Sequence, residues 1–195
     1  MANEVEICGV VKEIEIAHKI GNLQFYKIVI ETGTKNKAPE RLKVVVEDKD
    51  ISLFQVDEPV HLKCELKSYT YHYNNENGEK RIKKIAFISF VEKLEELGDL
   101  LNLVTFYGQI IQPPHEISTH DGSGLYLVRM HELEGRTPEK PAYVNATILK
   151  NRCKVELEKL DRLHIIGYLG MNKVKINDGL TIENVEIRAT KLIKE

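Results

Sequence analysis

Aromatic and basic side chains gather between positions 67 and 84 of this chain. Tyr69, Tyr71 and Tyr73 would share one face of a strand, because successive strand side chains point to opposite faces. After an Asn-rich turn come four cations, namely Lys80, Arg81, Lys83 and Lys84. Tyrosine rings can stack on exposed bases for about 1–3 kcal/mol each, and cations can contact phosphates. The pattern favours binding to a single-stranded nucleic acid; the alternative is an ordinary exposed hairpin whose lysines protect a sheet edge.

Weaker candidate contacts lie on other predicted strands. Phe25 and Lys27 share one face of a strand, and Arg41 and Lys43 share one face of the next strand. The second half of the chain has three candidate phosphate contacts, namely Arg129, Lys173 and Lys175. Solvated surface is the alternative interpretation for each of these residues.

Residue patterns for catalysis or metal binding are not found in the sequence. Its 7 histidines lack zinc-ligand spacing, and its 3 cysteines form no Cys-x-x-Cys pair. There is no Walker or dinucleotide loop, and the segment Asp121–Gly124 is a turn rather than a nucleophile elbow. We therefore expect a protein that is not an enzyme and that needs no cofactor and no metal.

Composition limits the partners and the compartment. The net charge is −2, so binding to a polyanion must come from local patches rather than from a global field. No apolar run reaches the length of about 18 residues that a membrane span needs, and the first residues do not resemble a signal peptide. An odd number of unpaired cysteines suits a reducing compartment. We expect a cytoplasmic protein that does not contact a membrane.

The elements that must position these side chains occur twice. Gly9 and Gly108 lie 99 positions apart in similar apolar segments, and two further pairs of segments correspond at offsets of 100 and 103. Those pairs are Phe25–Ile30 with Leu125–Met130, and Val60–Leu66 with Leu163–Leu169. Solenoid repeats are about 20–50 residues long, so this period indicates two domains. We predict domains over residues 1–92 and 103–195, joined by a short helical connector over 93–102.

Each copy has five strand-like segments rich in Val, Ile, Tyr and Phe. A short helix is predicted between the third and fourth segments, over 48–57 and, more clearly, over 150–161. This order is that of an OB-fold barrel, so the predicted fold class is all-β, with two tandem five-stranded Greek-key barrels. The predicted strands are Val5–Ile16, Leu23–Glu31, Leu42–Glu47, Val60–Tyr73 and Arg81–Val91, then Leu103–Gln112, Leu125–Glu132, Ala142–Leu149, Leu163–Val174 and Leu180–Ile187.

Several local patterns carry a family resemblance. Asn102–Gly108 and, more loosely, Asn3–Gly9 open the copies with Asn-x-Val-x-apolar-x-Gly. Asp121–Val128 is a Gly-rich turn with an apolar strand, and Leu163–Leu169 alternates around a glycine. Tyr73 directly precedes the tip of the hairpin between the fourth and fifth predicted strands. Over nearly its whole length, once per copy, the chain resembles bacterial single-stranded DNA-binding proteins (SSB) and their relative primosomal replication protein B.

The resemblance implies a protein of DNA replication, recombination or repair that binds single-stranded DNA, with RNA left open. It places a stacking aromatic at Tyr143. It also implies a homo-oligomer, because a dimer of two-domain chains gives the four OB domains of tetrameric SSBs. Typical SSBs stack bases on tryptophan, of which this chain has 0, and we expect no acidic C-terminal recruitment tail.

Two further expectations complete the sequence interpretation. The hairpin between the last two strands of the second copy reads as shortened, so we expect the first copy to bind more strongly. The alternative function is an OB-fold scaffold in a replisome, phage or mobile-element complex, with weak nucleic-acid binding or none.

Overall fold

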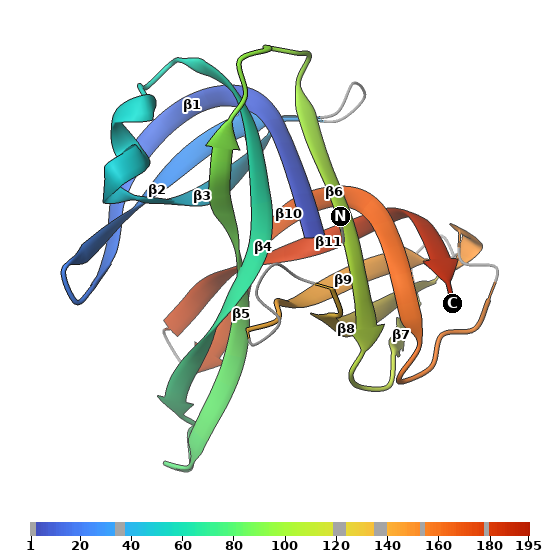
Figure 1. The fold of residues 1–195 in the computed structure, drawn as a ribbon. Helices are drawn as coiled ribbons and strands as arrows, with labels where there is room; N and C mark the ends of the chain where they lie inside the picture. Colours follow the sequence, from blue (N-terminus) through green and yellow to red (C-terminus); the bar gives the residue numbers. More distant parts are fainter. Residues whose placement is uncertain (1–2, 34–37, 119–123, 135–139, 153–154, 178–179) are drawn as a thin grey trace. The chain divides into compact units, whose positions relative to one another are not determined.

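The computed structural model describes residues 3–33, 38–118, 124–134, 140–152, 155–177 and 180–195 (Figure 1). Strands make up nearly all of its regular structure, which confirms the predicted all-β class. The first copy contains β1 (Asn3–Ile20), β2 (Leu23–Thr32), β3 (Glu40–Glu47), η1 (Asp48–Leu53), β4 (Pro59–Asn74) and β5 (Lys80–Lys93). The second contains β6 (Leu101–Ile110), β7 (His115–Ile117), β8 (Leu125–Glu132), β9 (Tyr143–Leu149), η2 (Lys150–Arg152), β10 (Arg162–Asn177) and β11 (Leu180–Lys194).

Both copies follow one strand order. In the first copy the order is β2-β3-β5-β4-β1, and β1 pairs back with β2. In the second it is β6-β10-β11-β9-β8, and β6 pairs back with β8, to which β7 adds a short edge. The pairings β3–β5 and β9–β11 are parallel. Closing the sheet in this way leaves few open edges, as in the Greek-key OB barrel.

Strand register confirms the duplication residue by residue. Gly9 lies opposite Val60 in β4 and opposite Thr32 in β2. Gly108 lies opposite Leu163 in β10 and opposite Glu132 in β8. The partners are therefore offset by 103 and 100 positions, the same values that the sequence comparison found.

A close strand approach explains the two glycines. A Cβ atom on Gly9 would lie 2.4 Å from the Glu31 carbonyl oxygen, and one on Gly108 would lie 2.5 Å from the His131 carbonyl oxygen. Real Cβ contacts are not this short, so any larger residue would push the first strand of each barrel away from its second. Each glycine thus allows the backbones of the first two strands of its barrel to approach closely.

The predicted helices are shorter than expected. η1 ends at Leu53 rather than at 57, and η2 covers only Lys150–Arg152 of the predicted segment 150–161. Near the end of the predicted segment, the Leu160 amide donates to the Ile110 carbonyl at 2.9 Å and Leu160 has φ 78°, so the chain is not helical there. Cys153, most of the predicted turn Asp121–Gly124, and residues 34–37 and 178–179 lie outside the described residues.

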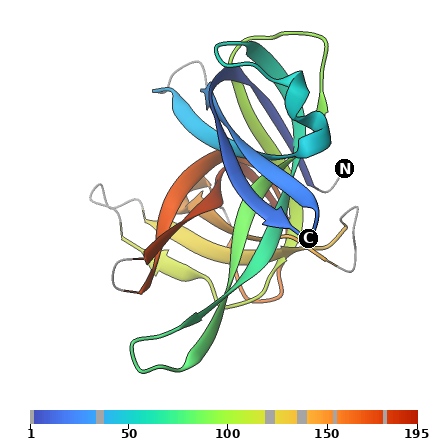
Figure 2. The same cartoon turned by 90° about the vertical axis from the view of Figure 1, so that its left-hand side faces the viewer.

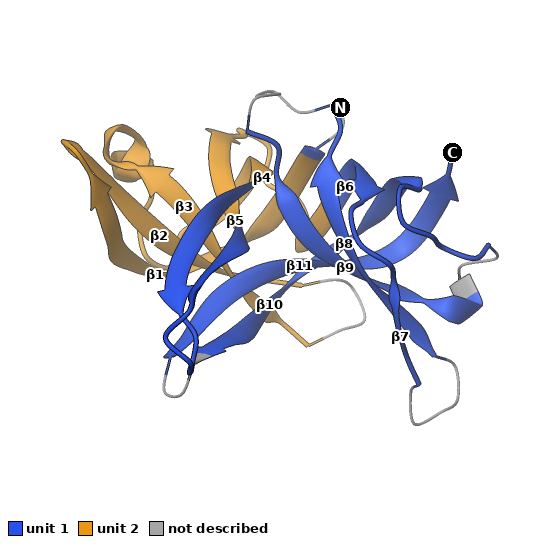
Figure 3. Ribbon diagram, turned by 90° about the horizontal axis from the view of Figure 1, so that it is seen from below, with its two compact units in different colours: residues 1–3, 67–86, 104–195 blue, residues 4–66, 87–103 orange. Residues whose placement is uncertain are grey.

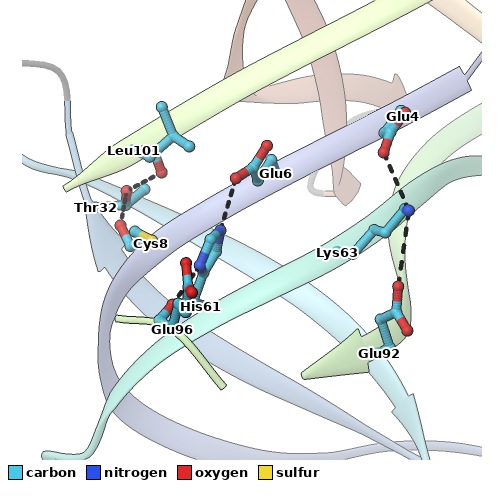
Figure 4. A network of polar contacts seen from close by, with 9 residues as sticks. All are labelled: Glu4, Glu6, Cys8, Thr32, His61, Lys63, Glu92, Glu96 and Leu101. Atoms are coloured by element: carbon cyan, nitrogen blue, oxygen red, sulfur yellow. Dashed lines mark hydrogen bonds and ion pairs between the residues drawn. The ribbon is translucent and has the colours of Figure 1, made fainter. Parts of the chain in front are cut away.

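The predicted helical connector is not a helix. Residues 94–100 have no helical structure, and Leu97 is 59% exposed. The Leu94 amide donates to the carbonyl of His61, whose Nδ1 lies 2.6 Å from the Glu96 carbonyl oxygen. Figure 4 shows the contact of His61 with Glu96 and the neighbouring ion pairs of Lys63 with Glu4 and Glu92. Hydrogen bonds to β4 thus replace the i→i−4 hydrogen bonds of a helix. Gly98 also disfavours a helix in this segment.

The structure divides into two compact units. Unit 1 contains residues 1–3, 67–86 and 104–195, and unit 2 contains residues 4–66 and 87–103 (Figure 3). The distal part of the β4–β5 hairpin, residues 67–86, thus groups with the second copy of the repeat. The predicted domain bounds, 1–92 and 103–195, stay a prediction.

Candidate nucleic-acid interface

The three tyrosines of the β4–β5 hairpin lie on alternate positions of one uninterrupted strand, as predicted. The rings of Tyr71 and Tyr73 stack, with centroids 6.3 Å apart and planes at 25°. Tyr69 is 42% exposed, and partial burial raises its pKa, with a smaller effect of Tyr71. In Figures 1 and 2 the end of this hairpin projects beyond its neighbouring strands. The row therefore offers aromatic surface on a projecting ribbon.

The cations of the hairpin meet residues of the second copy inside unit 1. The Lys84 ammonium donates to the Thr70 hydroxyl at 2.7 Å and lies 5.2 Å from the centroid of the Tyr143 ring. The Arg129 guanidinium donates to the Lys84 carbonyl oxygen at 3.3 Å. Burial, and then the charge of Arg129, lower the pKa of Lys83. Lys84 thus lies beside the Tyr143 ring, and Arg129 contacts Lys84 and is close enough to Lys83 to lower its pKa. We call these four residues the Lys84–Tyr143 cluster: Lys83, Lys84, Arg129 and Tyr143.

Crowding of like charge makes this cluster suited to an anion. Burial also lowers the pKa of Arg129, so part of its hydration is already lost in the free protein. A phosphate that bridges these cations would relieve their mutual repulsion and form charge-assisted hydrogen bonds.

Two polar contacts attach the hairpin to the second copy. The Tyr143 amide donates to the Ser68 hydroxyl at 3.1 Å, and the Ala86 amide donates to the Asn184 side-chain oxygen at 2.9 Å. Asn184 is 4% exposed, so this bond is buried and costly to break. Sequence reasoning missed both residues, because a serine or asparagine on a strand carries no distinctive pattern.

His131 is a further aromatic neighbour that the sequence did not single out. Its ring lies 6.1 Å from that of Tyr143, and its Nε2 lies 3.3 Å from the Gln109 side-chain oxygen. The register His131↔Tyr143 between β8 and β9 produces this pair. The predicted strands over 125–132 and 142–149 contain both residues, so pairing these two strands in sequence would have placed His131 near Tyr143.

The remaining predicted contacts of unit 1 are exposed. Lys80 and Arg81 lie at the start of β5, where Arg81 forms an ion pair with Glu79. Lys173 and Lys175 are exposed on β10, opposite Glu183 and Thr181. The structure therefore brings Lys83, Lys84, Arg129 and Tyr143 together. It does not place the other predicted cations in the cluster, namely Lys80, Arg81, Lys173 and Lys175.

The hairpin of the second copy is not shortened, contrary to the sequence interpretation. β10 spans 16 residues, as does β4, and β11 spans 15 residues where β5 spans 14. The strands themselves are therefore not shortened, and residues 178–179 between β10 and β11 lie outside the described residues.

In unit 2 the predicted cations face carboxylates. Arg41 lies 3.5 Å from Glu31, and Lys43 lies 3.5 Å from Glu15. Lys27 is paired in register with the same Glu15. These carboxylates compete with phosphate, so the four predicted residues of this unit, Phe25, Lys27, Arg41 and Lys43, form a less basic surface than the cluster.

Phe25 has a partner of its own in unit 2. Its ring stacks on His18 with centroids 4.9 Å apart and planes at 11°, so one face of Phe25 is covered.

Within the described ranges, no three His, Cys, Asp or Glu side chains are grouped to hold a metal ion. In the same ranges, no helix has the length and apolarity to cross a membrane.

Comparisons with known proteins agree with this architecture. Neither a protein-family model nor a curated protein matches the sequence. A deletion mutant of the single-stranded DNA-binding protein from Thermus aquaticus matches with a TM-score of 0.72 and 18% identity, over 99% of this chain and 94% of that chain. The wild-type Thermus aquaticus protein matches with a TM-score of 0.70 and 15% identity, over 99% and 92%.

A third match is partial. The Plasmodium falciparum SSB, solved in complex with single-stranded DNA, has a TM-score of 0.40 and 18% identity, over 51% of this chain and 99% of that chain. The two whole-chain matches settle the architecture. This chain has the tandem two-domain OB fold of the Thermus aquaticus single-stranded DNA-binding protein.

Proposed function

We propose that this protein binds single-stranded DNA, without enzymatic activity, in replication, recombination or repair. The observation that carries the proposal is the Lys84–Tyr143 cluster, in which a cation lies over an aromatic ring and further cations lie nearby, on the same hairpin as the tyrosine row of β4. The fold shared with the Thermus aquaticus protein supports it. Aromatic faces and cations side by side are the two features that single-strand binding needs.

The proposed mechanism divides these residues into two roles. Tyr71, Tyr73 and Tyr143 stack on bases, and Lys83, Lys84 and Arg129 contact phosphates. Stacking needs no particular base, because every base has a π face, so little sequence preference is expected. A duplex hides its bases and should bind less tightly. The exposed cations Lys80, Arg81, Lys173 and Lys175 would extend the phosphate path.

Assembly is part of the proposal. A dimer of this chain would supply four OB folds by pseudo-symmetry. RNA is a second possible ligand of the same surface, because a phosphate path and stacked bases do not by themselves select the sugar.

The test is a salt titration of binding to labelled oligo-dT, oligo-U and duplex DNA. We expect oligo-dT to bind more tightly than duplex, and log K to fall by about 0.7 per neutralised phosphate for each unit of log salt. Oligo-dT that does not bind even at low salt would overturn the proposal and favour the scaffold function.

A further inference from the structure

Unit 2 contains a pocket that the DNA-binding proposal does not use. It has a volume of about 570 Å³ and lies between η1, the end of β5 and the segment after it. Its apolar lining includes Leu53, Phe90 and Leu97, of which Leu53 is 46% exposed and Leu97 is 59% exposed. Exposed apolar side chains around a concave site are typical of an interaction surface.

The charge of the pocket excludes nucleic acid. Its lining includes the carboxylates Asp50, Glu58, Glu92 and Glu95 and a single cation, Lys93. The Lys93 ammonium lies 2.6 Å from Glu58 and donates to the Leu53 carbonyl oxygen at 2.9 Å, so its charge is already used. A phosphate backbone would be repelled. The chemistry fits an apolar segment that carries positive charge.

The β1–β2 hairpin of unit 2 ends in a segment of that chemistry. Ile16, Ile20 and Leu23 are 76%, 61% and 57% exposed, and Lys19 lies among them at an exposed position. We call residues 16–24 the tip. None of the tip residues lines the pocket. The tip therefore presents uncovered apolar side chains together with a cation.

The tip is held in a defined conformation. His18 stacks on Phe25, and the Gln24 side-chain amide donates to the His18 carbonyl oxygen at 2.9 Å. The strand register shifts between Ile16 and Lys19, and Gly21 turns the chain with φ 58°. A preorganised element loses little conformational entropy when it docks, which favours binding.

We propose that the tip of one copy of this protein docks into the pocket of a second copy. Ile20 and Leu23 cover the apolar floor, and Lys19 approaches the carboxylate rim. In a two-fold dimer the contact is made twice, with the tip of each copy in the pocket of the other. It is independent of the DNA-binding proposal, since none of its residues belongs to the Lys84–Tyr143 cluster.

The experiment is sedimentation velocity of the full chain without DNA, over a range of concentrations. We expect the wild type to self-associate, and Ile20→Asp and Leu97→Asp each to raise the dissociation constant about tenfold or more, as for loss of an interface anchor. Both side chains are exposed, so the fold should persist, which circular dichroism checks. Ile193→Asp, at a side chain 62% exposed in unit 1, is the matched control and should associate like the wild type.

Mixing the two variants gives the decisive result. Ile20→Asp retains an intact pocket and Leu97→Asp retains an intact tip. An equimolar mixture should therefore form a heterodimer at concentrations where each variant alone stays monomeric. Lys19→Glu should weaken association less than Ile20→Asp and should reduce its salt dependence. A monomeric wild type, single variants that associate normally, or a mixture that stays monomeric would each overturn the proposal. Oligo-dT binding is measured separately and tests only the DNA function.

Discussion

The ammonium of Lys84 lies 5.2 Å from the centroid of the Tyr143 ring, although the two residues come from different copies of the repeat. A cation at this distance from an aromatic face is attracted by about 0.5–1 kcal/mol at an exposed site. In the proposed function, this pair would place a phosphate contact beside a stacking surface, and both copies would contribute residues to one binding site.

The two residues should be energetically coupled in DNA binding. We expect Lys84→Ala and Tyr143→Ala to be non-additive in a double-mutant cycle, with a coupling of about 0.5–3 kcal/mol, as for residues in contact. Fluorescence anisotropy with labelled oligo-dT measures the four affinities. Lys173→Ala combined with Tyr143→Ala is the control, and its effects should add. Additive losses for Lys84 and Tyr143 would mean that the two residues bind the strand separately.

The hairpin tyrosines should contribute stacking energy. Tyr71→Ala and Tyr73→Ala should each weaken oligo-dT binding by about 1–3 kcal/mol, because each removes an aromatic face. Tyr71→Phe and Tyr73→Phe keep the ring and should bind nearly as the wild type does. From the sequence we expect Tyr143→Ala to have the smaller effect. If it proves more damaging than the hairpin changes, the main site lies in the second copy.

Salt dependence should separate the cluster from unit 2. Lys83→Ala should reduce the slope of log K against log salt by about 0.7, the value for one phosphate contact on a single strand. Arg41→Ala should change the slope less, because Arg41 lies 3.5 Å from Glu31. The measurement is a titration of oligo-dT at several salt concentrations. Equal slope changes for the two variants would show that the Glu31 pairing does not exclude phosphate.

The strand-crossing glycines should be required for stability. Gly108→Ala would place a Cβ 2.5 Å from the His131 carbonyl oxygen, and the resulting strain should reduce the free energy of unfolding by about 1–3 kcal/mol. Gly98→Ala is the matched control, since its nearest neighbour is the Cys8 sulfur at 3.6 Å. Urea denaturation measures both variants. A Gly108→Ala protein as stable as the wild type would contradict the close approach of β6 and β8.

Acid should weaken unit 2 through Glu58. The hydrogen bond from Lys93 holds the pKa of Glu58 below its ordinary value. Its stabilising contribution is therefore present above the pKa of an unfolded glutamate, about 4.3, and is lost as the pH falls through the lower folded value. Glu58→Gln should remove this part of the pH dependence of the free energy of unfolding. A variant with an unchanged acid profile would exclude Glu58 as a contributor.

Sequence patterns predicted the architecture because the two copies keep the same residue types at corresponding buried positions. Gly9 and Gly108, with their partners in the next strands, are constrained by backbone contact, so their spacing survives in both copies. The tyrosine row of β4 was equally predictable, since alternation along a strand fixes the shared face.

Other features depend on contacts that the sequence does not encode locally. Amides of the connector and of the segment after η2 donate to distant carbonyls, those of His61 and Ile110, which helix periodicity cannot reveal. The Lys84–Tyr143 cluster was missed for a similar reason. Both residues were candidates, but only the fold brings positions 59 residues apart along the chain together.

The assignment of residues 67–86 to the same compact unit as 104–195 has a consequence for how the chain can be divided. The Ala86–Asn184 and Ser68–Tyr143 bonds join the hairpin of the first copy to the second copy. If the chain were cut within 94–100 and the halves separated, the buried Asn184 side chain and the Ala86 amide would lose their hydrogen bond. We therefore expect each half, expressed alone, to be less stable than the same half within the whole chain.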